Sequence, residues 1–192
     1  MPLSLFPMSI RAANAARAVY VCRESKDAFV SWWHFATKLV GGENNTDLES
    51  SLSMFVRGLS PYRPFWEHCL EYWRQSVTRP NKILFLKYEN MIAEPVKHVK
   101  RMAMCLGVLF SAKEEEDRVP EKVVRLCSFD KLSGLPANQS GQTICTRNMV
   151  LERSVFFRKG KVGDWANRMT QDMGRKIDRV TEEKLNGSGL VL

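Results

Sequence analysis

The chain has 192 residues, of which 44% are hydrophobic and 26% charged, so it is long enough for a single domain, residues 1–192, with its own core. No apolar run reaches transmembrane length, and the start has two prolines and no basic segment, so neither a membrane protein nor a secretory signal is expected. Five cysteines without a CxxC pair and three scattered histidines predict reduced thiols, a cytoplasmic protein and no metal site.

The formal net charge of +8 favours an anionic partner: nucleic acid, a membrane surface or a phosphorylated small molecule. A basic surface without any partner would give the same charge. Nucleic acid ranks last, because the chain has no basic stripe interleaved with aromatic residues and no nucleic-acid-binding module. The positions of the basic residues must therefore decide.

Two short runs of β-branched and aromatic residues predict buried strands at residues 18–23 and 82–88. Helical spacing follows the first run, with Ser25 as the expected N-cap. Residues 132–154 are polar and without periodicity, which predicts a long flexible loop that could serve as a lid. Further helices are expected at residues 48–57, 64–77, 95–107, 119–127 and 170–185.

Strands that alternate with helices indicate an α/β fold with a parallel sheet. Only two strands are evident, however, and a two-stranded parallel sheet is not a viable core by itself. Either a further strand lacks the expected pattern, or part of the domain lies outside this sequence. The expected architecture is therefore an incomplete parallel sheet flanked by helices.

The end of the first predicted strand is the first candidate for anion binding. Ligands of open parallel sheets lie beyond the carboxyl ends of the strands, which is where Arg23 stands. Ser31 follows about two helical turns later, and a guanidinium with a hydroxyl suits a phosphate group. Alternatively, Arg23 is an exposed side chain paired with Asp27, and Ser31 packs inside.

The second candidate is the string FFRKGKVGDW. Two adjacent cations, Arg158 and Lys159, are followed by Gly160, whose missing side chain lets the backbone amide approach an anion. The alternative is an ordinary basic loop, but the full RKGxxGDW pattern is far more specific than an RKG tripeptide.

Five strings in this order, VYVCRESKDAFVSWWHF, ILFLKYENM, LCSFDKLSGL, FFRKGKVGDW and EEKLNGSGL, closely resemble the cytosolic sulfotransferases of the plant type. The resemblance runs over the whole chain. It implies a P-loop-type fold with a five-stranded parallel sheet, of which this sequence is the C-terminal portion. It also implies the co-substrate 3′-phosphoadenylyl sulfate (PAPS) and a small-molecule acceptor with a hydroxyl group.

The resemblance assigns roles by position. The 3′-phosphate of the co-substrate would be held by Arg23, Ser31, Arg158, Lys159 and the amide of Gly160. The adenine would lie near Tyr88 and the Cys127–Phe129 segment, which includes Ser128 and in which Phe129 would stack on the base.

No residue of this sequence matches the catalytic base of the family, a histidine that aligns immediately upstream of Met1. The family's phosphosulfate-binding loop and its lysine align further upstream. His34, His68 and His98 are expected to have structural roles. We therefore expect impaired transfer by this chain alone and a sheet surface exposed for association. The alternative function is a non-catalytic protein that binds 3′-phosphoadenosine or another chain.

Overall fold

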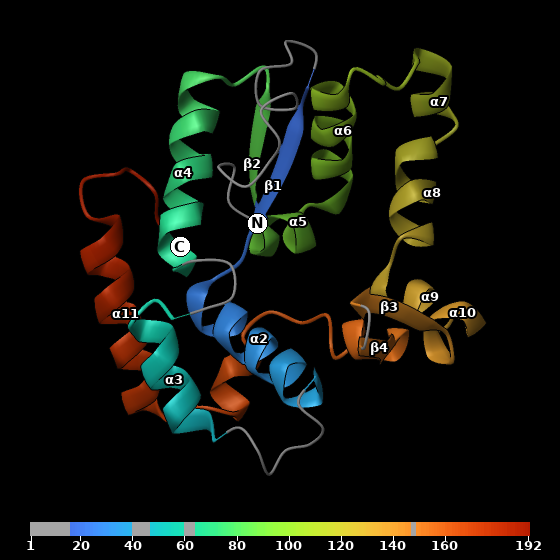
Figure 1. Ribbon diagram of the computed structural model, residues 1–192. Coiled ribbons are helices and arrows are strands. Elements are labelled where there is room, and N and C mark those ends of the chain that lie inside the picture. Colours follow the sequence, from blue (N-terminus) through green and yellow to red (C-terminus); the bar gives the residue numbers. More distant parts are fainter. Residues whose placement is uncertain (1–15, 40–46, 60–63, 147–148) are drawn as a thin grey trace.

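The computed structural model describes residues 16–39, 47–59, 64–146 and 149–192. Its central feature is a pair of parallel strands, β1 (Ala18–Cys22) and β2 (Ile83–Lys87), in which Tyr20 is the register partner of Phe85 (Figure 1). The two strands that the sequence predicts are confirmed, and so is the α/β fold with a parallel sheet. The connection between them is long, since the described residues between them include three helices.

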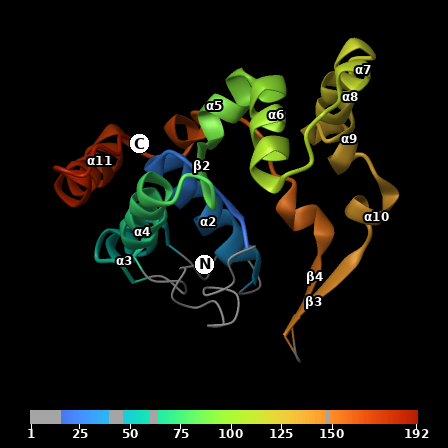
Figure 2. The same ribbon diagram turned by 90° about the horizontal axis from the view of Figure 1, so that it is seen from above.

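Different helices cover the two faces of this sheet, α4 (Phe65–Thr78) on one side and α6 (Pro95–Leu106) on the other (Figure 1 and Figure 2). On the α4 side, the ring of Tyr20 stacks on Tyr72 with their centroids 4.1 Å apart. Val21 points to the opposite face and is 46% exposed. The prediction of a buried strand is wrong for β1, where only Cys22 is buried, because β1 pairs with a single strand among the described residues.

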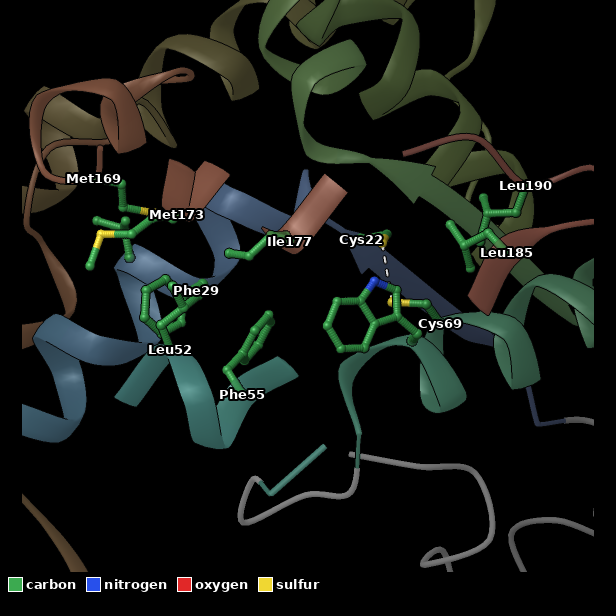
Figure 3. Packing of buried hydrophobic residues seen from close by; sticks show 12 residues of the cluster. Cys22, Phe29, Leu52, Phe55, Cys69, Met169, Met173, Ile177, Leu185 and Leu190 are labelled. Carbon is green, nitrogen blue, oxygen red and sulfur yellow. Dashed lines mark hydrogen bonds between the residues drawn. The ribbon is translucent and has the colours of Figure 1, made fainter. Parts of the chain in front are cut away.

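The main core lies beyond the carboxyl ends of the strands, where α2 (Ser25–Leu39), α3 (Leu48–Val56) and α11 (Gln171–Leu185) meet α4 (Figure 3). Aromatic rings dominate its centre: Phe55 lies 5.2 Å from Phe29 and 5.2 Å from Trp66, measured between ring centroids. Burial of rings of this size supplies most of the stabilisation in a core of this kind.

The C-terminal residues complete this core. The indole Nε1 of Trp73 donates a hydrogen bond to the carbonyl of Ser188 at 2.9 Å, and that of Trp66 donates to the hydroxyl of Thr181 at 2.9 Å. Leu190 is only 4% exposed. The end of the chain is therefore part of the packing around α4.

Glu24, rather than Ser25, caps α2. The amides of Lys26 and Asp27 each donate to the Glu24 carboxylate at 3.0 Å, and a negative charge at this end also suits the helix dipole. The hydroxyl of Ser25 lies 3.0 Å from that of Thr181 on α11 instead. The prediction of Ser25 as the N-cap is therefore wrong, and Ser25 links two helices.

The described residues within 132–154 form short helices and a hairpin rather than the long loop that the sequence predicts, and the flexibility of this segment stays a prediction. The side-chain amide of Asn138 donates to the carbonyl of Leu132 at 2.8 Å, and the amide of Arg153 donates to the carbonyl of Gly141 at 2.7 Å. The antiparallel hairpin extends away from the helices of the core (Figure 2). In order, the elements are α9 (Phe129–Ser133), α10 (Pro136–Gln139), β3 (Gln142–Thr146) and β4 (Met149–Glu152).

The remaining elements are short. The other predicted helices are confirmed to within about a residue at each end, and α5 starts directly at the end of β2. The short elements not given above are α5 (Tyr88–Ala93), α7 (Ala112–Glu116), α8 (Val119–Leu126), and the 3-10 turns η3 (Arg153–Phe156) and η4 (Asp164–Asn167).

Candidate anion-binding site

The carboxyl ends of the two strands bring Arg23 and Tyr88 together. Arg23 follows β1, and Tyr88 is the first residue of α5, one position beyond β2. Because the strands are parallel and in register, their ends meet, and the Arg23 guanidinium carbon lies 4.8 Å from the centre of the Tyr88 ring. This cation–π contact holds Arg23 at the edge of the sheet.

Arg23, Ser31 and Arg158 line one cavity of about 450 Å³. Its walls are one side of α2 and the segment that follows the hairpin, including Phe156. The structure therefore brings together three residues that the sequence singles out in two distant motifs. His34 also lies in the wall, on the same helix as Ser31. Cavities of this size hold small organic molecules.

The side chain of Arg23 is suited to an anion. One terminal nitrogen, Nη2, donates to the carbonyl of Lys161 at 2.7 Å and to the carboxylate of Asp27 at 3.3 Å. Its Nε is buried and has no hydrogen-bond partner among the described residues. A buried donor without a partner is costly, and a phosphate oxygen is an acceptor that would satisfy it.

Asp27 joins α2 to the basic loop, a role that sequence reasoning missed. Its carboxylate is 1% exposed and accepts hydrogen bonds from the backbone amides of Gly163 at 2.7 Å and Trp165 at 2.9 Å. These bonds cross 136 and 138 positions of the sequence. Two sequence signals could have indicated this role: an acidic residue in the first turn of the helix, and the GDW turn. Neither signal shows by itself that the two segments meet.

Asp164 holds the two cations of the basic loop. Its carboxylate accepts hydrogen bonds from Arg158 and, at 2.6 Å, from the Lys159 ammonium. Burial alone would raise the pKa of Asp164, but the hydrogen bonds from Lys159, Arg158 and Asn167 outweigh it and hold the pKa well below the usual value of 3.8. The carboxylate is therefore ionised at neutral pH and orients both cations.

The charges of this region do not cancel. Three cations, Arg23, Arg158 and Lys159, are opposed by two buried carboxylates, Asp27 and Asp164. An arginine has five N–H donors, so each guanidinium keeps donors that its carboxylate does not use. The site thus combines a positive excess with oriented donors, which is the chemistry that binds a phosphate group.

Gly160 and Phe129 are in direct contact. Gly160 has a φ of +61°, and a Cβ at this position would lie 2.4 Å from Cδ2 of the Phe129 ring. Ser128 caps α9 by accepting the amide of Lys131 at 3.4 Å, which fixes the start of the helix that carries Phe129. The predicted phosphate and base segments therefore lie against each other.

The other two histidines lie outside this cavity wall. Nδ1 of His68 lies 2.6 Å from the hydroxyl of Tyr20, and that of His98 lies 3.4 Å from Arg101.

Within the described ranges, no three side chains of His, Cys, Asp or Glu gather as a metal site requires. None of the helices described is both long and apolar enough to cross a membrane.

Comparisons with known proteins point to one family. A family model described as "Sulfotransferase domain" matches residues 1–189. Cytosolic sulfotransferase 16 of Arabidopsis thaliana is 44% identical over 100% of this chain, and flavonol 3-sulfotransferase of Flaveria bidentis is 43% identical over 97%. The chain spans just over half the length of these relatives, 56% and 60% respectively.

Solved structures give the same result. Mouse sulfotransferase SULT7A1, crystallised with PAP (3′-phosphoadenosine 5′-phosphate), is 26% identical to this chain. Its TM-score is 0.80, and the match covers 98% of this chain and 64% of the mouse chain. A putative steroid sulphotransferase of Arabidopsis thaliana is 30% identical, with a TM-score of 0.69 over 100% of this chain and 52% of its own. The fold, the ordered motifs and the match to the family model lead to one conclusion: this chain belongs to the sulfotransferase family.

Proposed function

We propose that this chain supplies the 3′-phosphoadenosine side of a PAPS site in a cytoplasmic sulfotransferase, which transfers a sulfonate group to a hydroxyl of a small-molecule acceptor. The observation that carries the proposal is the cavity shared by Arg23, Ser31 and Arg158, together with the unpartnered Nε of Arg23. Its support from relatives is the PAP in the mouse structure and the word "cytosolic" in the names of the plant relatives.

The residues divide the work of binding. Arg23, Arg158 and Lys159 would hold the 3′-phosphate, with the Ser31 hydroxyl and the Gly160 amide as further donors. Tyr88 and Phe129 would lie against the adenine, because an aromatic ring offers a flat apolar face to a base. When bound, PAPS supplies the activated sulfonate group.

The acceptor is proposed by class. One relative is named for flavonols and one solved structure for steroids, and both classes are small molecules with hydroxyl groups. Because the chain spans only part of these proteins, transfer itself is a proposal for the whole protein. The hairpin of β3 and β4 remains a candidate lid for the acceptor.

Binding without transfer is the second candidate. It is favoured by the placement of His68 and His98, which contact Tyr20 and Arg101 rather than the cavity, whereas His34 does lie in the cavity wall. A purified chain that binds PAP but transfers no labelled sulfonate from PAPS to a panel of flavonols and steroids would select this candidate.

Calorimetric titration with PAP tests the shared part of both candidates. We expect micromolar affinity, weakened at least tenfold in Arg158→Ala and severalfold in the milder Ser31→Ala, because each removes a donor to the phosphate. Arg175→Ala is the matched control, since Arg175 is an exposed arginine of α11 paired with Asp172. Absence of PAP binding by the folded wild-type chain would reject the proposal.

A further inference from the structure

Two thiols meet where β1 ends against α4. The Sγ atoms of Cys22 and Cys69 lie 3.4 Å apart, although the residues are 47 positions apart in the sequence (Figure 3). Their side chains are 1% and 0% exposed, so no solvent separates them. They come from two elements that pack face to face, and neither has a role in the anion-binding site.

Polar groups beside Cys69 distinguish the two thiols. The hydroxyl of Tyr20 lies 3.2 Å from the Cys69 Sγ and 2.6 Å from Nδ1 of His68. Burial would raise the pKa of Cys69, but hydrogen bonding by Cys22, His68 and Tyr20 outweighs it and lowers the pKa. The hydrogen bond to Cys69 and burial raise the pKa of Cys22. Because the Tyr20 hydroxyl can donate to the Cys69 sulfur, Cys69 is the thiol whose thiolate has a hydrogen-bond donor beside it.

We propose that Cys22 and Cys69 are a modification site, at which a peroxide converts the two thiols into a reversible intramolecular disulfide. The Cys69 thiolate attacks one oxygen of hydrogen peroxide, the O–O bond breaks, and protonation of the leaving hydroxide gives water and a sulfenic acid. The Cys22 sulfur then attacks the Cys69 sulfur, the S–O bond breaks, and the thiol proton leaves with the hydroxyl as a second water. Two thiols are oxidised and one peroxide is reduced.

The geometry favours the second step. A disulfide needs sulfurs roughly 2.05 Å apart, so the pair must close by roughly 1.4 Å. A sulfenic acid at Cys69 would form directly beside its resolving thiol, 3.4 Å away in the reduced pair, so condensation outcompetes further oxidation to the sulfinic acid. The bond would tie the last residue of β1 to α4.

Intact mass spectrometry tests the proposal. A chain with Cys105, Cys127 and Cys145 replaced by serine would be treated with hydrogen peroxide and alkylated under denaturing conditions. We expect the mass to fall by the two hydrogens of the thiols, both thiols to resist alkylation, and dithiothreitol to restore them. Two alkylated thiols after peroxide treatment, or addition of two oxygens to one sulfur, would overturn the proposal.

Two variants in the same background separate this chemistry from general oxidation. Cys69→Val keeps an apolar side chain in the core and must show no loss of hydrogens. Tyr20→Phe removes the hydroxyl beside Cys69 and is expected to slow the reaction severalfold while leaving the final mass unchanged, and an unchanged rate would contradict the role of Tyr20. A melting temperature measured for each reduced variant checks that it folds.

Because Cys22 precedes Arg23, a second readout rests on the proposed function. We expect the oxidised chain to bind PAP with an affinity changed at least threefold from the reduced chain, and reversal by dithiothreitol. Mass spectrometry reports the disulfide even if PAP does not bind, so failure of the proposed function and failure of this inference give different results.

Discussion

At the scale of single residues, the contact between Gly160 and Phe129 leaves no room for a larger side chain. Gly160→Ala would place a methyl group 2.4 Å from the ring, in a backbone with φ of +61°. We expect a loss of stability of about 2–4 kcal/mol, from the left-handed backbone and the displaced ring together, and at least tenfold weaker PAP binding. Urea denaturation and calorimetry measure the two effects.

Gly187→Ala is the control for backbone strain. Gly187 has a similar φ of +70°, but a Cβ there meets no atom within 4 Å. Its cost should stay near about 1–2 kcal/mol, with unchanged PAP affinity. Equal losses of stability in the two variants would show that the ring moves away without cost.

The lowered pKa of Asp164 predicts a pH dependence. A carboxyl whose pKa is lower in the folded than in the unfolded state stabilises the fold above the unfolded pKa, and this contribution is lost as the pH falls through the folded pKa. The difference in unfolding free energy between wild type and Asp164→Asn should therefore be constant from about pH 5 to 7 and shrink below about pH 4. Urea denaturation across this range measures it, and a difference that grows on acidification would contradict it.

The cations of the site and the pairing of Arg23 with Asp27 could be predicted from the sequence, whereas the bonds from Asp27 and Asp164 to the basic loop could not. RKGxxGDW and the arginine after a strand point to phosphate, because basic groups and close-approach backbone have few other uses together. In the sequence, Asp27 is an ordinary acidic residue at the start of a helix, and Asp164 is an ordinary residue of a turn. Their partners, Gly163 and Arg158, depend on how two distant segments pack, which no local pattern contains.

At the scale of elements, α2 and the basic loop act as one unit through Asp27. Asp27→Ala would remove the acceptor of two part-buried amides, each loss costing about 1–3 kcal/mol, and would release one contact of Arg23. We expect a total loss of about 2–5 kcal/mol and faster hydrogen exchange at residues 158–165.

Asp172→Ala is the matched control for this element. Asp172 is also an acid in the first turn of a helix, but it is exposed and pairs with Arg175 three positions later. Its removal should change stability by less than about 1 kcal/mol. Exchange that stays slow at residues 158–165 in the folded Asp27→Ala chain would show that the loop is held by other contacts.

The helices and strands with a clear hydrophobic period were predictable almost to the residue, and the hairpin was not. Residues 142–146 and 149–152 contain threonine, isoleucine and valine, which favour strands, but each segment is short and surrounded by glycine, serine and asparagine. The helix cap was missed for a related reason: serine is the commoner cap, and only the structure shows Ser25 engaged with Thr181.

At the scale of the whole molecule, the sheet presents apolar surface. Val21 of β1 is 46% exposed, and the segment after α6 carries Val108 and Leu109 at 65% and 70% exposure. The association through an exposed sheet surface that the sequence suggests stays a prediction. We expect self-association that increases with concentration, measured by sedimentation velocity.

Val21→Lys tests where that association occurs, because a charge on an exposed strand opposes pairing with another chain. It should lower the apparent association constant at least fivefold. Val77→Lys is the control, since Val77 is 62% exposed but lies on α4. Equal effects of the two variants would mean that net charge, rather than the sheet, governs association.

The packing of Leu190 into the same core as Phe29 sets the time at which the molecule can fold. Ribosomes add roughly 5–20 residues per second, so roughly 8 to 32 s pass between the synthesis of these two residues. For most of that interval Phe29, Phe55 and Trp66 have been made, but Leu190 has not. This core can therefore be completed only once Leu190 has been made, and until then the exposed rings favour aggregation.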